Sequence, residues 1–445
     1  MNKKILSLLL VISMLTLSFV GCAPKKETPV DKAEVTEATT EQATETTEAA
    51  SADEVTLSWA VFETDNYTAE FWQHIIDTFE ADNPGIKIEK VLMTGDSRAQ
   101  FLKTMLSAGE LPDINIDPTE LAKIEGVYAA VPEELLAKFE DSAVVSFNGV
   151  KNLIPASKQL RSQAFYNKAQ FKDAGITAAP KTWAEFLDAC EKLKAKGYTP
   201  LITAGAGDIW ATGFGYWAGV VNSEVYSAYP NFNQDVLSGK LSWTDPVIVD
   251  ALQVWQDLNT NGNFNKGSMS YSYGQASSEF FSGSAAMMLD GSWVAPGIDA
   301  STEYSNEDFG SFVMPTPTGA KTYCSANQYW AVAETCENKE AAFKFCEYVL
   351  GGNPELYQYY LKTDGLFAAT KETVTYEMGP AQTEFVDNYK GYQSVPEITK
   401  VLGDVALPTG FEDFVMKSLQ NVFIGADVKT ELATWDVEMA RLMEQ

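Results

Sequence analysis

Short apolar runs bounded by turn residues alternate with helical patterns along most of the chain. Residues 55–62 (VTLSWAVF) and 86–93 (IKIEKVLM) are typical of strands. Between them, large apolar residues recur at helical spacing around His74, and this pattern stops at the turn residues 82–85. The pattern therefore predicts a strand, a helix and a second strand, in that order.

A second helix is predicted over residues 96–109. Asp96 or Ser97 can cap its start, and Gly109 is a natural stop because glycine readily adopts the left-handed conformation that ends helices. Residues 112–117 (PDINID) then predict a short strand. The resulting β-α-β-α-β order implies a parallel sheet flanked by helices.

The middle of the chain carries further α/β units. Thr182 and Glu185 are spaced as a capping box at the start of a helix that is predicted to run to Gly197. Residues 200–205 (PLITAG) follow as a strand. Because α/β units occur in both halves of the chain, the pattern favours an α/β fold with two lobes.

Residues 280–294 (FFSGSAAMMLDGSWV) combine an apolar strand pattern with an abrupt turn. Asp290, Gly291 and Ser292 are turn residues, and the large indole of Trp293 follows them directly. Side chains next to such turns tend to be reachable from solvent. Trp293 is therefore a candidate binding residue, although a purely structural role stays open.

Aromatic and acidic residues gather at the carboxyl ends of several predicted strands, where open α/β sheets bind ligands. Each residue alone could equally be a helix cap or a partly buried ring. Jointly they suit a sugar, whose CH-rich ring face stacks on an aromatic while its hydroxyls donate to carboxylates. No phosphate-binding glycine motif follows a strand. The groups are Phe62 with Glu63 and Asp65, Asp117 with Glu120, Asp208 with Trp210, and Asp290 with Trp293.

Composition narrows the classes of ligand and partner. A chain of 445 residues suggests about two domains. Its formal net charge of −29 disfavours nucleic acid and anionic membrane surfaces, since both need a basic footprint. Arginine, the usual clamp for carboxylate or phosphate, occurs only as Arg98, Arg161 and Arg441. An anionic ligand is therefore disfavoured, although Arg161 alone could still bind one.

Histidine and cysteine usage limits catalysis and metal binding. The single histidine, His74, lies within a helical apolar pattern, which argues against a serine–histidine triad or a multi-histidine metal site. No cysteine pair has zinc-type spacing, but Cys324 and Cys336 could form a disulfide outside the cytoplasm. Paired carboxylates could still catalyse hydrolysis. We expect no metal and no cofactor.

The amino terminus has the features of a secretory signal peptide over residues 1–21, with lysines followed by a long apolar segment. Residues 19–22 (FVGC) resemble a bacterial lipobox, apart from Phe19 where leucine is usual. The resemblance implies cleavage before Cys22 and a lipid on its sulfur, and a plain secreted protein is the alternative. Residues 22–54, rich in Thr, Glu and Ala, predict a disordered tether.

Five segments resemble, in order, the sugar-binding group of extracellular solute-binding proteins (family 1) of bacterial ABC importers, the group that includes maltose-binding protein. The resemblance extends from about Val55 to the carboxyl end. Any one segment is a weak match, whereas five in sequence are a specific one. The segments are FEADNPGIKIEKV, LKTMLSAGELPDINI, FYNKAQFKDAGITAAPKTWAEF, FFSGSAAMMLDGSW and KEAAFKFCEYVL.

The resemblance also implies binding residues. Trp293 matches the tryptophan that commonly stacks on the bound sugar in this family, and Trp210 and Phe414 fall where further aromatic platforms stand. Polar contacts would come from the first lobe and from a returning segment. With the strand-end residues and Arg161 included, the candidate ligand-binding residues are Trp293, Trp210, Asp117, Glu120, Asp65, Glu63, Asp208, Phe414, Tyr329, Gln328 and Arg161.

The implied fold is the periplasmic-binding-protein type II fold, in which a hinge joins two α/β lobes with a ligand cleft between them. Three chain crossings would form the hinge. The expected limits are 55–158 plus 318–366 for lobe one, 159–317 plus 367–445 for lobe two, and crossings near 155–162, 314–320 and 364–372.

The implied function is capture of a neutral sugar or oligosaccharide by a monomeric, lipid-anchored extracellular protein, which delivers it to the permease subunits of an ABC transporter. A uronate would need Arg161 or lysines in the cleft. A polyamine would suit the carboxylates and the aromatic faces. A surface glycosidase would need two carboxylates about 5–10 Å apart, and no such pair is evident in the sequence.

Overall fold

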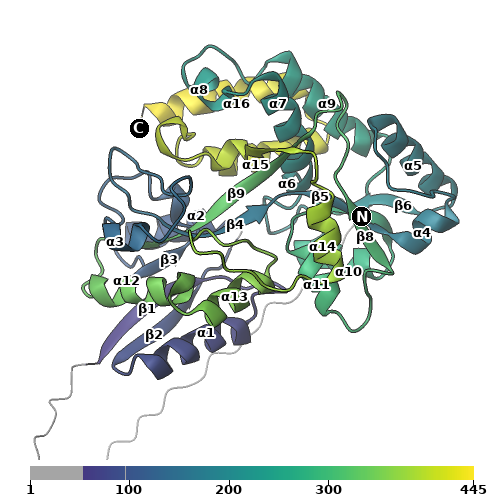
Figure 1. Cartoon of the computed structure of the whole chain (residues 1–445). Helices are drawn as coiled ribbons and strands as arrows, with labels where there is room; N and C mark the ends of the chain where they lie inside the picture. The colour runs from purple at the N-terminus through teal and green to yellow at the C-terminus, as the bar shows by residue number, and fades with distance from the viewer. Residues whose placement is uncertain (1–53, 96, 445) are drawn as a thin grey trace, which may run out of the picture. The chain divides into compact units, whose positions relative to one another are not determined.

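The computed structural model describes residues 54–95 and 97–444 (Figure 1). The chain divides into two units, residues 1–51 and 52–445, and the described residues all belong to the second. The predicted signal peptide, Cys22 and all of the predicted tether except its last residue lie outside the described residues, as does Asp96. In the described part, no helix is both long enough and apolar enough to cross a bilayer.

A first, mixed sheet is built from segments that lie far apart in the sequence. Its order is β10-β9-β3-β1-β2, and β4 also pairs with β9. As predicted, β1 is parallel to β2 and to β3, whereas β9 runs antiparallel to β3 and β4. The strands are β1 (Val55–Val61), β2 (Ile86–Leu92), β3 (Ile114–Ile116), β4 (Ile154–Leu160), β9 (Thr322–Val332) and β10 (Gln393–Pro396).

Local sequence signals set the helices beside this sheet. Helix α1 (Ala69–Asp82) starts after Thr68, whose hydroxyl caps its first turn, and it packs against β2. Helix α2 (Arg98–Ala108) is capped by the Ser97 hydroxyl and ends at Gly109, which adopts a φ of 73°. Both predicted helices are confirmed.

A second sheet has the order β6-β7-β5-β8. Strand β6 is parallel to β7, and β5 is antiparallel to β7 and to β8. The apolar run that precedes Trp293 forms β7, as predicted, and the capping box of Thr182 and Glu185 opens helix α5 (Trp183–Ala195). The strands are β5 (Gln163–Asn167), β6 (Thr199–Ile202), β7 (Ala285–Asp290) and β8 (Phe309–Phe312).

The remaining helices surround the two sheets (Figure 1). Helix α12 contacts β9, α4 contacts β5, and α9, α15 and α16 contact one another. They are η1 (Pro118–Glu120), α3 (Glu133–Leu136), α4 (Lys168–Asp173), α6 (Phe214–Tyr216), η2 (Trp217–Val221), α7 (Asn222–Ala228), α8 (Phe232–Leu237), α9 (Pro246–Thr260), η3 (Ser268–Ser270), α10 (Tyr273–Phe281), α11 (Val294–Ala300), α12 (Lys339–Glu347), η4 (Tyr348–Gly352), α13 (Pro354–Thr363), α14 (Pro380–Asp387), η5 (Ile398–Lys400), η6 (Gly403–Val405), α15 (Phe411–Phe423) and α16 (Val428–Met443).

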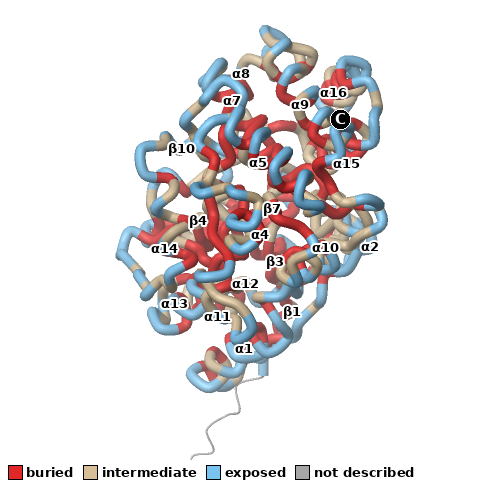
Figure 2. The backbone as a smooth tube through the Cα atoms, turned by 90° about the vertical axis from the view of Figure 1, so that its right-hand side faces the viewer, coloured by how far each residue is buried: buried red, intermediate tan, exposed pale blue. Residues whose placement is uncertain are grey.

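Separate apolar cores distinguish the lobes. We call the first sheet and its core, drawn from residues 57–156 and 329–369, the first lobe. The second sheet and its cores, drawn from residues 164–314 and 381–439, are the second lobe. Most residues of β4 in the first lobe and of β7 in the second lobe are buried (Figure 2). The lobe limits and crossings given above stay predictions.

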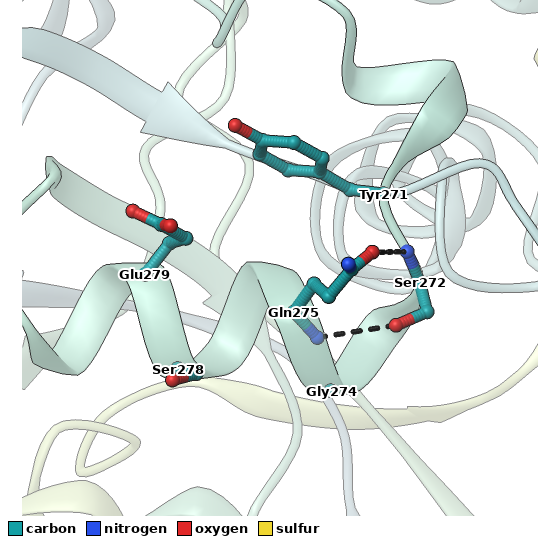
Figure 3. A pocket seen from close by; sticks show the side chains of 6 residues that line it. All are labelled: Tyr271, Ser272, Gly274, Gln275, Ser278 and Glu279. Atoms are coloured by element: carbon teal, nitrogen blue, oxygen red, sulfur yellow. Dashed lines mark hydrogen bonds between the residues drawn. The ribbon is translucent and has the colours of Figure 1, made fainter.

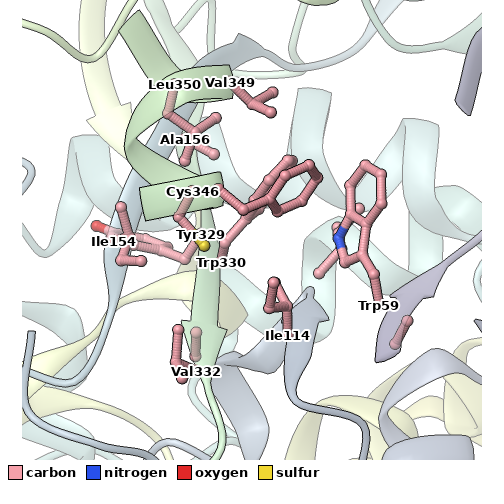
Figure 4. Packing of buried hydrophobic residues seen from close by; sticks show 14 of the residues in the cluster. Trp59, Ile114, Ile154, Ala156, Tyr329, Trp330, Val332, Cys346, Val349 and Leu350 are labelled. Atoms are coloured by element: carbon pink, nitrogen blue, oxygen red, sulfur yellow. The ribbon is translucent and has the colours of Figure 1, made fainter. Parts of the chain in front are cut away.

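Aromatic packing dominates the first-lobe core. The Trp59 ring lies 5.1 Å from the Trp72 ring and 5.1 Å from the Trp330 ring, measured between centroids. Figure 4 shows Trp59 and Trp330 among the aliphatic residues of β3, β4 and β9. Full burial of a large apolar side chain stabilises a fold by about 1.5–3 kcal/mol, so this core fixes how β1, β3 and β9 lie together.

Candidate functional site

Trp293 is positioned by the turn that follows β7. Asp290 ends the strand, Gly291 and Ser292 form the turn, and Trp293 directly precedes α11. A Cβ atom at Gly291 would overlap the Trp293 ring, so only glycine lets the indole lie over the turn. The ring is half-buried. Local sterics therefore explain the Gly-x-Trp spacing.

An aromatic cluster forms around Trp293 from Trp210, Phe214 and Tyr273. Ring centroids lie 6.2 Å apart for Trp293 and Trp210, 5.4 Å for Trp293 and Phe214, and 4.8 Å for Trp210 and Tyr273. Nε1 of Trp293 donates to the Tyr273 hydroxyl over 2.8 Å. The structure thus brings together two of the candidate stacking residues, Trp293 and Trp210.

Phe214 and Tyr273 are members of this cluster that sequence analysis missed. Tyr273 is the first residue of α10, directly after the capping residue Ser272. Phe214 lies in the aromatic-rich segment that follows β6. Neither carries a local signal that separates it from an ordinary core ring, because only the packing of β6 against β7 brings them together.

Two buried carboxyl groups, Asp290 and Asp364, lie beside the cluster. Asp290 accepts a hydrogen bond from the Tyr273 hydroxyl over 2.9 Å, and Asp364 accepts one from Asn66 over 2.9 Å. Burial is the main cause that raises the pKa of each to about 7. Charge repulsion from Asp364, and then from Asp65, adds to the rise in the pKa of Asp290. Both groups are therefore easily held neutral near pH 7.

Asn66 joins the lobes next to the cluster. Its Nδ2 donates to Asp364 and to the main-chain carbonyl of Trp293, both over 2.9 Å. Glu63 and Asp65, two predicted contacts, are exposed on the same loop after β1. This loop of the first lobe thus lies against the tryptophan turn of the second.

Asp117 is held by an ion pair at the end of β3. Its Oδ2 lies 2.6 Å from Nη1 of Arg98, whose guanidinium carbon lies 3.4 Å from the centre of the Phe62 ring. Burial alone would raise the pKa of Asp117, but Arg98, Lys400 and Arg161 outweigh it and hold that pKa below its ordinary value. Asp117 is therefore a charged carboxylate that already has a partner.

Glu120 directs its carboxylate toward the second lobe. The residue is only 6% exposed, its Oε1 lies 2.7 Å from Lys123 Nζ, and its Oε2 accepts the Gly410 N–H. Phe414, the third candidate platform, lies one turn into α15 and is half-buried, with its ring centroid 6.1 Å from that of Phe411. Glu120 and Phe414 are thus close to the same helix end.

Arg161 is neutralised within the protein. Its Nε lies 2.9 Å from Oε2 of Glu397, and the two side chains are 11% and 1% exposed. The guanidinium also donates to Gln159, and its carbon lies 5.5 Å from the centre of the Phe214 ring. Arg161 therefore borders the aromatic cluster, but its charge is balanced by a buried carboxylate.

Tyr329 and Gln328 make contacts away from the cluster. The Tyr329 hydroxyl donates to the Ala143 carbonyl over 2.9 Å within the first-lobe core, where burial raises its pKa to about 12. Gln328 accepts from the Ser157 hydroxyl over 2.7 Å, between β9 and β4. Asp208 is half-buried in the segment that follows β6. Tyr329 is thus a core residue of β9 here.

A hollow of about 430 Å³ lies against the start of α10, lined by Tyr271, Ser272 and residues of the first two helical turns (Figure 3). Ser272 and Gln275 hydrogen-bond to each other there, as a capping box. This hollow contains no candidate site residue. Among residues 54–95 and 97–444, no three His, Cys, Asp or Glu side chains are grouped to hold a metal ion. Cys324 and Cys336 are free and buried.

Comparison with known proteins agrees with this architecture. The model of the family described as "Bacterial extracellular solute-binding protein" matches residues 64–351. The multiple sugar-binding protein of Streptococcus mutans serotype c is 26% identical over 312 residues, which are 67% of this chain and 71% of that protein.

Solved structures share the fold over nearly all of their length. A chitin oligosaccharide binding protein superposes with a TM-score of 0.72 at 23% identity, covering 88% of this chain and 100% of that one. A sugar transporter protein from Bacillus licheniformis, in complex with stachyose, gives 0.69 at 20% identity, covering 87% and 100%. The fold is therefore the two-lobed periplasmic-binding-protein type II fold. The chain belongs to the bacterial extracellular solute-binding protein family.

Proposed function

We propose that this protein binds a neutral sugar or oligosaccharide between its two lobes. The observation that carries the proposal is the aromatic cluster, in which two half-buried indoles, Trp210 and Trp293, lie beside the place where Asn66 joins the lobes. Such rings stack on CH-rich sugar faces. The exposed carboxylates of Glu63 and Asp65, on the same loop as Asn66, supply acceptors for sugar hydroxyls.

Charge balance supports a neutral ligand over a uronate or a phosphate. Each arginine of the chain is paired, Arg98 with Asp117, Arg161 with Glu397 and Arg441 with Glu438. An anionic ligand at Arg161, the arginine that borders the aromatic cluster, would have to displace Glu397 from a buried pair, which leaves that carboxylate unpaired at a cost of several kcal/mol. A polyamine is the second candidate, favoured by the exposed carboxylates of Glu63 and Asp65 on the loop that lies beside the aromatic faces.

The proposed role of this binding is import. The similar protein from Streptococcus mutans is named as a multiple sugar-binding protein, and the Bacillus licheniformis structure holds stachyose. We propose that sugar favours closure of the lobes and that the closed monomer delivers it to ABC permease subunits, with a lipid on Cys22 as the membrane anchor. Permease stimulation by a variant locked open, without sugar, would contradict this role.

A thermal-shift screen of the purified protein tests the ligand class. The panel contains neutral mono- and oligosaccharides, uronates and polyamines. A ligand at 100 times its Kd stabilises the folded state by about 2.7 kcal/mol, which should raise Tm by several degrees. We expect neutral sugars to do so in the native protein and to lose the effect in Trp293→Ala.

Trp183→Ala is the matched control, because it removes another half-buried indole, at the start of α5, that packs on Phe186. It should leave the sugar-induced shift unchanged. If only polyamines or only uronates raise Tm, that class of ligand would replace neutral sugars in the proposal. An equal loss in both variants would show that Trp293 acts through stability and not through stacking.

A further inference from the structure

The lobes touch directly at the amino end of α15, on residues that the aromatic cluster does not use. Gly410 N–H donates to the Glu120 carboxylate, and the Thr409 hydroxyl donates to the Glu120 carbonyl over 3.1 Å. Lys123, which pairs with Glu120, donates from Nζ to the Leu407 carbonyl over 2.7 Å. We call Glu120, Lys123 and residues 407–410 the interlobe latch.

The latch crosses from one apolar core to the other. Leu121 and Ala122, between the two charged residues, belong to the first-lobe core. Leu407 and Phe411, at either end of the 407–410 segment, belong to a second-lobe core. The bonds from Glu120 and Lys123 to residues 407, 409 and 410 therefore join the lobes from protein to protein, and none of them needs a ligand.

Glu120 also occupies the place of a helix cap. Gly410 is the N-cap residue of α15 and has no side chain with which to cap it. A carboxylate at the amino end of a helix is favoured by the helix dipole. Nearby, the Ser97 hydroxyl from the start of α2 donates to Asp413 of α15 over 3.0 Å. The first lobe thus caps α15 through Glu120 and contacts a side chain of its first turn through Ser97.

The surrounding charges favour an ionised Glu120. Burial alone would raise the pKa of Glu120, but Lys123, the Gly410 N–H and Lys103 hold that pKa below its ordinary value. One carboxyl opposes it, since Glu412 on α15, whose side chain is 17% exposed, and Glu120 repel each other. Burial first, and then repulsion by Glu397 and Glu120, raise the pKa of Glu412 to about 7, while the ion pair with Lys400, whose Nζ lies 2.7 Å from Glu412 Oε2, opposes this rise.

We propose that Glu120 is a positioning residue that caps α15 across the lobe boundary and favours the closed form even when no ligand is bound. The proposal rests on the proposed function only where affinity is concerned. If the closed form is the one that binds, the apparent Kd equals the intrinsic Kd divided by the closed fraction. Loss of the latch then raises the apparent Kd of every ligand by the same factor, and the ranking of ligands by affinity is kept.

The experiment measures the distance between the lobes and the affinity for sugar separately. Spin labels are placed on Leu92→Cys of β2 and Val437→Cys of α16, which are 43% and 70% exposed in the first and second lobe. The background is the full chain with Cys22→Ala, and the cysteines at 190, 324, 336 and 346 are buried. Pulsed EPR gives the distance distribution without ligand, and calorimetry gives Kd for raffinose and stachyose.

In Glu120→Ala we expect the short-distance population to fall without ligand, and Kd for both sugars to rise by the same factor, about tenfold or more. Glu120→Gln keeps an acceptor for Gly410 and should recover part of the effect. Lys123→Met removes the bond to Leu407 and serves as a second variant if Glu120→Ala folds poorly. Glu133→Gln breaks the ion pair with Lys151 inside the first lobe and should change neither readout.

Distance distributions that are the same in the native protein, Glu120→Ala and Lys123→Met would overturn the proposal. So would a loss of affinity for one sugar but not the other at unchanged distances, because Glu120 would then be a ligand contact. If neither sugar binds the native protein, the proposed function loses support. The distance measurement still decides on the latch in that case.

Discussion

Asp364 shows how one buried residue can carry a measurable pH dependence. Burial raises its pKa to about 7, while Asn66, Arg98 and Arg161 favour the charged form without cancelling the effect. The native state therefore holds a proton at pH values where the unfolded chain has released it. The resulting stability is complete below the ordinary aspartate pKa near 4 and is lost as pH rises toward 7.

Asp364→Asn should make the stability of the protein less dependent on pH between 5 and 8. Asparagine keeps an oxygen that accepts from Asn66 but has no charge to desolvate. We expect the fall in Tm from pH 5 to pH 8 to be smaller in the variant, with Asp290 and Glu412 accounting for part of what remains. Thermal melts across this range measure it.

The control for this prediction is Asp141→Asn. Asp141 is exposed and paired with Lys371, which lowers its pKa, so it titrates below the tested range. Its substitution should leave the pH dependence from 5 to 8 as in the native protein. An Asp364→Asn protein with that same native slope would contradict the assignment.

At the scale of elements, short local signals set where the helices begin. The Thr182 hydroxyl accepts the Glu185 N–H, and the Glu185 carboxylate accepts the Thr182 N–H. These bonds satisfy donors that have no partner inside the helix. Because the capping box is complete within four residues, sequence spacing was enough to predict the start of α5.

Thr182→Ala should lower the free energy of unfolding by about 1 kcal/mol, because it removes the cap of α5. Thr434→Ala is the comparison, since Thr434 is exposed inside α16 and its hydroxyl only donates to the Glu431 carbonyl. Alanine has the higher helix propensity there, so we expect no loss. Urea unfolding of both variants measures the difference, and equal midpoints would argue against a stabilising cap.

At the scale of the whole molecule, the structure settles the question of a disulfide between Cys324 and Cys336. Cys324 lies in β9, packed against Phe214, whereas Cys336 belongs to the first-lobe core. The eight residue-to-residue steps of β9 from Cys324 to Val332 alone extend about 26 Å at 3.3 Å per step. A disulfide needs Cα atoms within about 7 Å, so the predicted possibility is excluded.

A reducing agent should therefore leave Tm unchanged. The thiols are buried, and burial raises the pKa of Cys190 and of Cys336 to about 12, which keeps them protonated and unreactive. Thiol titration of the native protein should find these groups slow to react until a denaturant is added. A fall in Tm of several degrees with reductant would contradict the free-cysteine structure.

Sequence alone determined what depends on neighbours along the chain. The caps at Ser97 and Thr182 and the stop at Gly109 are confirmed, because each is decided within one helical turn. Strand β7 and its Gly-x-Trp turn are equally local, since the Trp293 ring needs only the missing Cβ of Gly291 to take its place. The ordered match of five segments predicted the family, and the fold followed from it.

Tertiary structure decided what depends on residues far apart in the chain. Phe214 and Tyr273 join Trp293 only because β6 pairs with β7, and the mixed first sheet exists because β9 returns antiparallel to β3. Charge pairing is equally nonlocal: Arg161 meets Glu397, and Glu120 meets Gly410, across hundreds of residues. Periodicity and spacing carry no record of such partners, because the energy of a buried contact depends on proximity in space and not on separation along the chain.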